Sequence, residues 1–139
     1  MILAIDDEEH YIKSYIEELQ LSGLSVMVRS SVDSAAEFLD RNKTDVELCI
    51  MDIMIPAGKL FRDQDTRFGR RTGFLFYDYI RQRNPFLPVV ILTNVTAPDV
   101  DAKFGNERLC WWFRKDQCLP FEFVLHIQTI LASSSRTDQ

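Results

Sequence analysis

The chain has 139 residues and a formal net charge of −5, with 46% hydrophobic and 27% charged residues. A domain of this length buries a full core without disulfides or structural metal, and the composition excludes a disordered or fibrous chain. The acidic balance argues against nucleic-acid binding by the surface as a whole, because such domains usually carry a basic excess. No apolar run approaches the ~18 residues of a membrane span. Acids directly follow the first apolar run, so we expect a cytoplasmic protein without a signal peptide.

Cysteine and histidine offer no recognisable site. The three cysteines, Cys49, Cys110 and Cys118, are odd in number and lack C-x-x-C spacing, which favours neither a disulfide framework nor a zinc site. His10 and His126 stand apart from each other and from any metal-binding pattern, and we interpret them as surface or partly buried side chains. The chemistry must be sought in other residue types.

Apolar runs of strand character alternate along the chain with amphipathic runs of helical period. Strands are expected over residues 2–5, 24–28, 46–51, 88–93 and 109–113, and helices over residues 11–21, 31–39, 74–83, 97–104 and 121–131. Gly23 ends the first helix, and Ser31 or Asp33 caps the second. The alternation predicts an α/β fold, a doubly wound parallel sheet with helices on both faces. We expect one domain over residues 1–132 and a flexible polar tail over residues 133–139.

The connection between Asp52 and Gly73 is unusually long and shows little periodicity. Connections of this length in a compact domain are more often functional or mobile than simple links. Within it, the stretch over residues 57–72 carries a local charge of +3 inside an acidic chain. Its charged residues are Lys59, Arg62, Asp63, Asp65, Arg67, Arg70 and Arg71. The basic residues are candidates to reach a ligand, to cover a site or to contact a partner.

Polar residues stand where four of the expected strands end. Asp6 and Asp7 follow the first strand, Asp52 the third, Thr93 ends the fourth, and Lys115 follows the fifth. The carboxyl ends of parallel strands meet at one edge of a sheet, so these side chains converge. Carboxylate oxygens suit Mg²⁺, which would offset the negative charge of an incoming phosphoryl group. The set predicts a phosphoryl-transfer site with Asp52 as nucleophile, Lys115 as a cation and a hydroxyl from Thr93.

Each of these residues also has a purely structural interpretation. Asp6 and Asp7 could simply favour a helix N-terminus, and Asp52 could be a turn residue. Thr93 alone is an ordinary β-branched strand residue, and Lys115 alone would be a solvated lysine at a strand end. The functional interpretation rests on their occurring together.

Four short segments carry a resemblance to a known family. They are Ile5-Asp6-Asp7-Glu8, Met51-Asp52-Ile53-Met54-Ile55-Pro56, Ile91-Leu92-Thr93 and Phe113-Arg114-Lys115, with spacings of 45 from Asp7 to Asp52 and 22 from Thr93 to Lys115. In this order at strand ends, they resemble the CheY-like receiver domain of two-component response regulators over nearly the whole chain. The resemblance implies a flavodoxin-like sheet of five strands in the order 2-1-3-4-5.

The resemblance also implies the chemistry. Asp52 would accept a phosphoryl group from the phosphohistidine of a histidine kinase or histidine phosphotransfer protein in a phosphorelay. Mg²⁺ would be the cofactor, held by Asp7, Asp52 and the backbone carbonyl of Met54, with Asp6 acting through water. The chain would be no enzyme beyond catalysing its own phosphorylation and dephosphorylation.

Three residues are implied to contact the phosphoryl group or to transmit the signal. Thr93 would bind the phosphoryl oxygens and shift on phosphorylation, Lys115 would contact the acyl phosphate, and Trp112 would be the switch aromatic. A downstream protein target would dock on the face made by the fourth helix, the fifth strand and the fifth helix. No membrane or direct nucleic-acid contact is implied, and homodimerisation is left open.

Three features depart from the family's pattern. Asp116 stands where the family usually has a proline after its lysine, and Asn94 where it often has a small residue after its threonine. The long connection after Asp52 is an insertion beside the site. Two alternatives are therefore carried: a receiver-like interaction module with weak or no phosphorylation, and a Mg²⁺-dependent phosphatase acting through an aspartyl phosphate. The phosphatase would want an acid two residues after its nucleophile, where Met54 stands.

Overall fold

The computed structural model describes residues 1–7, 9–67, 69, 71–94 and 98–137. One parallel sheet runs through the molecule in the order β2-β1-β3-β4-β5, which confirms the predicted fold class and strand order. Its strands are β1 (Ile2–Ile5), β2 (Val26–Arg29), β3 (Leu48–Met51), β4 (Val89–Thr93) and β5 (Cys110–Arg114). The three inner strands are buried throughout, whereas β2 and β5 at the edges are half-buried. The nearly continuous apolar runs thus belong to strands covered on both faces.

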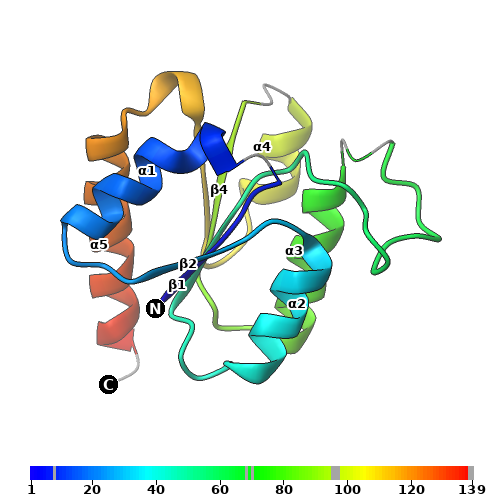
Figure 1. Ribbon diagram of the computed structural model, residues 1–139, viewed down its shortest axis with the longest axis horizontal. Coiled ribbons are helices and arrows are strands. Elements are labelled where there is room, and N and C mark those ends of the chain that lie inside the picture. The colour runs from blue at the N-terminus through cyan, green and yellow to red at the C-terminus, as the bar shows by residue number, and fades with distance from the viewer. Residues whose placement is uncertain (8, 68, 70, 95–97, 138–139) are drawn as a thin grey trace.

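Helices cover both faces of the sheet (Figure 1). They are α1 (Glu9–Leu21), α2 (Val32–Arg41), α3 (Thr72–Arg83), α4 (Pro98–Phe104) and α5 (Pro120–Thr137), with a 3-10 turn η1 (Lys115–Gln117). One apolar core lies between the sheet and α2, α3 and α4, and a second lies between the sheet and α1 and α5. Within the described residues, none of these helices combines the length and apolar character needed to cross a membrane.

Local signals set the end of α1 and the start of α2. Gly23 ends α1 with a φ of +91°, a left-handed conformation that glycine adopts without strain. The side chain of Ser31 caps α2 by accepting a hydrogen bond from the Ser34 amide at 3.1 Å. Of the two caps proposed for α2, Ser31 is the correct one. Asp33 instead accepts hydrogen bonds from the amides of Lys59 and Leu60. Ala97, the first residue of the predicted fourth helix, lies outside the described residues.

The last helix is longer than expected. We expected a helix ending at residue 131 and a flexible tail over residues 133–139, but α5 continues to Thr137, so residues 133–137 are helical. The apolar periodicity stops near Leu131, beyond which Ala132 and Ser133 are exposed. Once a helix is nucleated, each further residue adds a backbone hydrogen bond, so polar residues extend it. Residues 138–139 lie outside the described part of the chain.

The strand register brings the predicted site residues to one edge. Ile5 of β1 pairs with Met51 of β3, so Asp6 and Asp52 both leave the sheet at the same level. Met51 pairs in turn with Ile91 of β4, which runs on to Thr93 beside Arg114 at the end of β5. The carboxyl ends of four strands therefore surround a common space, which is the position where ligands bind in open α/β sheets.

Candidate functional site

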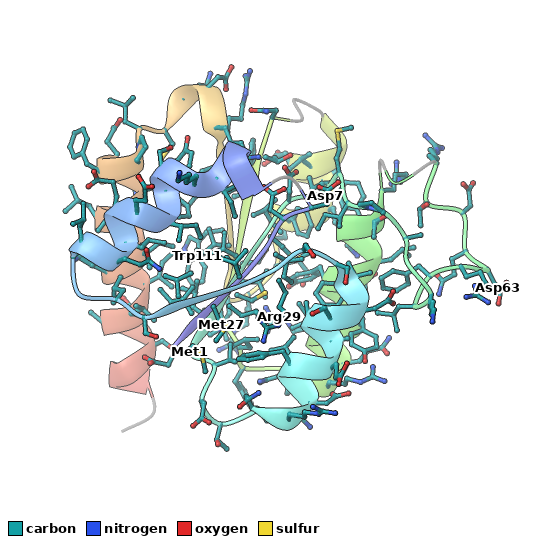
Figure 2. The ribbon with its side chains drawn as sticks, in the orientation of Figure 1. Met1, Asp7, Met27, Arg29, Asp63 and Trp111 are labelled. Carbon is teal, nitrogen blue, oxygen red and sulfur yellow. The ribbon has the colours of Figure 1, made fainter. Side chains whose placement is uncertain are left out.

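A pocket of about 620 Å³ opens at the carboxyl edge of the sheet. Five of the residues singled out from the sequence line it: Asp6, Asp7, Asp52, Met54 and Lys115. Asn94, at the start of the β4–α4 connection, lines it as well and is exposed. Asp7 marks this edge in Figure 2, at the opposite end of β1 from Met1. The structure thus brings together the acids and the lysine that the sequence analysis placed at separate strand ends.

The ammonium group of Lys115 lies among the carboxylates. Its Nζ is 3.0 Å from Oδ2 of Asp52 and 3.7 Å from Oδ2 of Asp6. The Lys115 side chain is 9% exposed, and those of Asp52 and Asp6 are 13% and 4% exposed, so water screens these charges only weakly. With Asp7 on the same pocket, three carboxylates face one ammonium. The remaining negative charge favours a cation.

The carboxylate of Asp52 is held in one orientation. Its Oδ1 accepts hydrogen bonds from the backbone amides of Ile53, at 2.6 Å, and Met54, at 3.3 Å. Its Oδ2 accepts the hydrogen bond from Lys115. Because both oxygens are engaged, the carboxylate is presented to the pocket without rotational freedom, as a nucleophile that must attack along a fixed line requires.

The donor set of the pocket fits Mg²⁺. Within the described part of the chain, no group of three His, Cys, Asp or Glu side chains could hold a metal ion by side chains alone. Mg²⁺, however, is usually bound through one or two carboxylates and keeps several waters. Asp7 and Asp52 with a backbone carbonyl at Met54 would supply such a set, and Asp6 would reach the ion through water. The individual ligand assignments stay predictions.

Two other residues from the sequence analysis lie apart from the pocket lining. Thr93 is completely buried at the end of β4. Trp112 is half-buried and packs against the core under α2, α3 and α4, whereas its neighbours Trp111 and Phe113 pack against the core under α1 and α5. Successive residues of β5 thus face opposite sides of the sheet, and the label of Trp111 lies on the α1 and α5 side in Figure 2. The switch roles of Thr93 and Trp112 stay predictions.

The three cysteines and His126 differ in how far they are buried. All three cysteines are free, with Cys49 and Cys118 buried and Cys110 half-buried. His126 is exposed, and its ring lies 4.6 Å from that of Phe113. The side chain of His10 lies outside the described part of the structure.

The loop that carries Lys115 is fastened by a tyrosine that the sequence analysis did not single out. The hydroxyl of Tyr15, on α1, lies 3.0 Å from the carbonyl oxygen of Lys115 and 2.8 Å from that of Cys118. Asp116, in the position where a proline was expected, pairs with Arg114 at 2.7 Å. Lys115 still reaches Asp52, so the tyrosine anchor supports the lysine in a loop that has no proline at this point. Contacts 100 and 103 residues apart in sequence leave no local signal.

Replacing Tyr15 by phenylalanine is expected to lower the free energy of unfolding by about 1–3 kcal/mol, since the carbonyl of Cys118, in a buried contact, and that of Lys115, in a partly buried one, lose the hydroxyl donor that they share. Burial raises the pKa of Tyr15 above its ordinary value, and nearby Cys118 and Asp116 raise it further. Because the pKa is raised in the folded state, the Tyr15 hydroxyl stays protonated to a higher pH in the folded protein than in the unfolded one. Its contribution is therefore complete below pH ~10, the ordinary tyrosine value, and is lost as pH rises through the raised pKa. Urea unfolding of the parent and of Tyr15→Phe between pH 7 and pH ~11 measures the difference in the free energy of unfolding. Tyr79→Phe on α3 is the control. An unchanged midpoint for Tyr15→Phe would contradict the anchor.

The inserted connection forms one wall of the pocket. Pro56, Ala57, Thr66 and Gly69 all line it. The returning part of the loop is tied to its start, because the amide of Ile55 donates a hydrogen bond to the carbonyl of Gly69 at 3.1 Å. A side chain on Gly69 would come within 3.0 Å of the Ile55 carbonyl oxygen, so this close approach requires glycine. The insertion is a built part of the site.

The described basic residues of the insertion do not line the pocket. Lys59, Arg62 and Arg67 are exposed, and none of them lines the pocket. Arg71 lies over the ring of Phe74 at 4.8 Å. Arg70 is outside the described residues. Figure 2 shows Asp63 at the outer end of the insertion, far from Asp7. Among the described residues that line the pocket, Lys115 is therefore the basic one.

Gly73, in the first turn of α3, touches the strand end that carries Asp52. Its amide donates to the carbonyl of Ile53 at 2.8 Å. A Cβ atom at this position would lie 2.4 Å from Cα of Ile53 and 2.7 Å from the carbonyl oxygen of Asp52. The helix can approach the site this closely only because residue 73 has no side chain.

Comparisons with known proteins agree with this geometry at the level of the fold. No family model matches the sequence, and no curated protein matches it at a significant level. Among solved structures, a response regulator receiver domain protein from Clostridium thermocellum superimposes with a TM-score of 0.77 at 19% identity, over 98% of this chain and 97% of that one. The chemotaxis protein CheY4 of Vibrio cholerae gives a TM-score of 0.72 at 21% identity, over 93% and 96% of the two chains.

A third solved structure extends the agreement to a further bacterium. The receiver domain of NtrX from Brucella abortus gives a TM-score of 0.74 at 19% identity, over 95% of this chain and 98% of that one. Identities this low show the fold and leave the chemistry to the residues of the pocket. Along nearly its whole length, the chain has the fold of the receiver domains of response regulators.

Proposed function

We propose that the chain is a phospho-accepting receiver domain, which takes a phosphoryl group from a phosphohistidine onto Asp52. The observation that carries this proposal is the 3.0 Å contact between Nζ of Lys115 and Oδ2 of Asp52 in an otherwise acidic pocket. An ammonium beside a fixed carboxylate serves a reaction in which that carboxylate acquires further negative charge. The shared receiver fold supports it.

The residues present divide the reaction between them. An oxygen of Asp52 forms the new bond to phosphorus while the bond from phosphorus to the donor imidazole nitrogen breaks, and the imidazole, which carries a proton on its other nitrogen, leaves as a neutral base. Lys115 stabilises charge on the phosphoryl oxygens, and the Thr93 hydroxyl donates to them as it shifts. Mg²⁺, held by Asp7, Asp52 and the Met54 carbonyl, with Asp6 acting through water, would offset the repulsion between carboxylates and phosphoryl group.

The biological setting belongs to the same proposal. The donor is a histidine kinase or a histidine phosphotransfer protein, and the product signals through Thr93 and Trp112 to a protein that docks on α4, β5 and α5. The chain acts in the cytoplasm, changes no substrate other than itself, and contacts neither membrane nor nucleic acid.

Incubation with a small phosphodonor and Mg²⁺ tests the chemistry. We expect an adduct with the mass of one phosphoryl group, labile to hydroxylamine, which forms at least ~10-fold more slowly when Mg²⁺ is chelated. Asp52→Asn should lose it, whereas Asp45→Asn, at an exposed acid outside the pocket, should keep it. Intact-protein mass spectrometry follows both variants. Absence of an adduct on the parent protein, or its persistence in Asp52→Asn, would refute the proposal.

A second candidate is a receiver-like interaction module that is phosphorylated weakly or not at all. It is favoured by Asn94, a large polar side chain on the pocket where the family often has a small one, and by the wall that the insertion adds. The mass assay separates the two, since the module would form no adduct. Multiple turnover of phosphomonoesters would instead support a phosphatase, although Met54 lines the pocket where that chemistry wants an acid.

A further inference from the structure

The inserted loop is clamped to α2 where it begins. Both carboxylate oxygens of Asp33 accept hydrogen bonds from loop amides, Oδ2 from Lys59 at 2.9 Å and Oδ1 from Leu60 at 2.8 Å. Gly58, with a φ of +62°, lies so close above this carboxylate that a Cβ atom would come within 2.4 Å of Oδ2. The arrangement requires a glycine at residue 58 and a short acceptor at residue 33.

The residue after the clamp anchors the loop a second time. Phe61 is 4% exposed, and its ring lies 6.4 Å from those of both Phe76 and Tyr79 on α3, in edge-to-face geometry. A buried aromatic ring of this kind contributes roughly 1.5–3 kcal/mol by its burial. The clamp and the aromatic anchor together fix residues 58–61 across α2 and α3. The exposed tip, residues 62–65, projects beyond them (Figure 1).

The clamped segment lies between residues that line the Asp52 pocket. Ala57 precedes it, and Thr66 and Gly69 follow it. Thr66 is buried, and its hydroxyl accepts the Gly69 amide at 3.2 Å. A displacement of residues 58–61 therefore pulls on both sides of the pocket wall, since the wall consists of the two chain segments that enter and leave the clamp.

We propose that Asp33 is a positioning residue, which holds the insertion against α2 and thereby sets how wide the entrance to the Asp52 pocket is. The effect of Asp33 on the width of the pocket entrance follows from the geometry and does not depend on the proposed function. Its consequence for the reaction, a longer life of the acyl phosphate through restricted entry of water, rests on the proposed function. Asp33 touches no reacting atom and acts through the wall of Ala57, Thr66 and Gly69.

The clamp itself is tested by hydrogen exchange. In Asp33→Ala, the amides of Lys59 and Leu60 should exchange about 10- to 100-fold faster, because each loses a charged acceptor. Asp33→Asn, which keeps one carbonyl acceptor, should lie in between. Glu37→Gln is the matched control: it neutralises an acid on the same helix that pairs with Arg41 instead of the loop. Unchanged exchange of both amides in Asp33→Ala would overturn the proposal.

Access to the pocket is tested with a thiol in place of the nucleophile, which needs no phosphoryl chemistry. In Asp52→Cys, the rates of alkylation by iodoacetamide and by a bulky maleimide give a measure of size selectivity. Removing the clamp as well, with Asp33→Ala, should raise the maleimide rate about 10-fold while the iodoacetamide rate changes less. Cys49 monitors unfolding, because it is completely buried and burial raises its pKa to about 12.

The outcomes separate the alternatives. A selective gain for the bulky reagent, with Cys49 unlabelled, supports the proposal. Faster exchange at Lys59 and Leu60 with unchanged size selectivity would overturn it, as would equal gains for both reagents accompanied by labelling of Cys49. In the parent background, Asp33→Ala should also shorten the lifetime of the phosphorylated protein several-fold. If the parent forms no adduct, the proposed function fails, but the alkylation results still decide the role of Asp33.

Discussion

Replacing Lys115 with methionine is expected to slow phosphorylation of Asp52 by about 100- to 1,000-fold, the usual effect of removing one group that stabilises developing charge. The same change should lower the free energy of unfolding by about 3–5 kcal/mol, because it leaves buried carboxylates without the ammonium they face. Methionine retains most of the side-chain volume, so the loss reports on charge and not on packing. Both effects follow from the contacts of Nζ with Asp52 and Asp6, at 3.0 and 3.7 Å.

Lys103→Met is the matched control for this prediction. Its ammonium pairs with Asp78 at 2.7 Å, a shorter contact, but both side chains are about one-third to one-half exposed. Exposed pairs contribute about 0–1 kcal/mol, so this variant should unfold almost as the parent does. Urea unfolding with and without Mg²⁺ makes the comparison, and Mg²⁺ should recover stability in Lys115→Met more than in the parent. Equal losses in the two variants, or no loss in Lys115→Met, would show that the pocket charges are uncoupled.

Gly73→Ala is expected to slow phosphorylation of Asp52 by about 100-fold and to destabilise the fold by about 1–3 kcal/mol. The new methyl group would meet backbone atoms of Ile53 and Asp52 at 2.4 and 2.7 Å, and backbone cannot move aside as a flexible side chain can. Either α3 retreats or the strand end that carries Asp52 shifts. Rates of adduct formation and urea midpoints measure the two effects.

Gly23→Ala separates the effect on chemistry from the effect on stability. A Cβ atom on Gly23 meets nothing within 4 Å, but the φ of +91° strains any other residue, at a cost of about 1–2 kcal/mol. The two glycine variants should therefore lose similar stability, while only the one at residue 73 loses reactivity at Asp52. If both variants keep the parent's phosphorylation rate, α3 does not position the site.

The positions of Asp6, Asp52 and Lys115 could be predicted because their placement depends on the backbone. Apolar runs locate the strands, and in a parallel sheet every strand ends at the same edge, so a residue just after a strand has its place before any side-chain contact is known. The pairing of Ile5 with Met51 confirms this placement for Asp6 and Asp52, the residues that follow them. The roles assigned to these residues stay predictions.

Tyr15 and Asp33 could not be found in this way. Each binds backbone groups of a distant segment, and the hydrogen bonds of Asp33 span 26 and 27 residues. Periodicity records which face of a helix is apolar, but it does not record where a hydroxyl or carboxylate at the end of a side chain finds a partner. The end of α5 was misjudged because apolar periodicity reports core contact and not helix length.

The double anchoring of the inserted loop separates its tip from the site. Residues 62–65 are exposed and lie outside the clamp at Asp33 and the buried ring of Phe61, so their length and composition are not constrained by the pocket. Doubling the length of a surface loop costs only about 0.6 kcal/mol of closure entropy. A fluorophore or an epitope tag can accordingly be introduced at the tip, which belongs to the loop that walls the pocket but does not itself line the pocket.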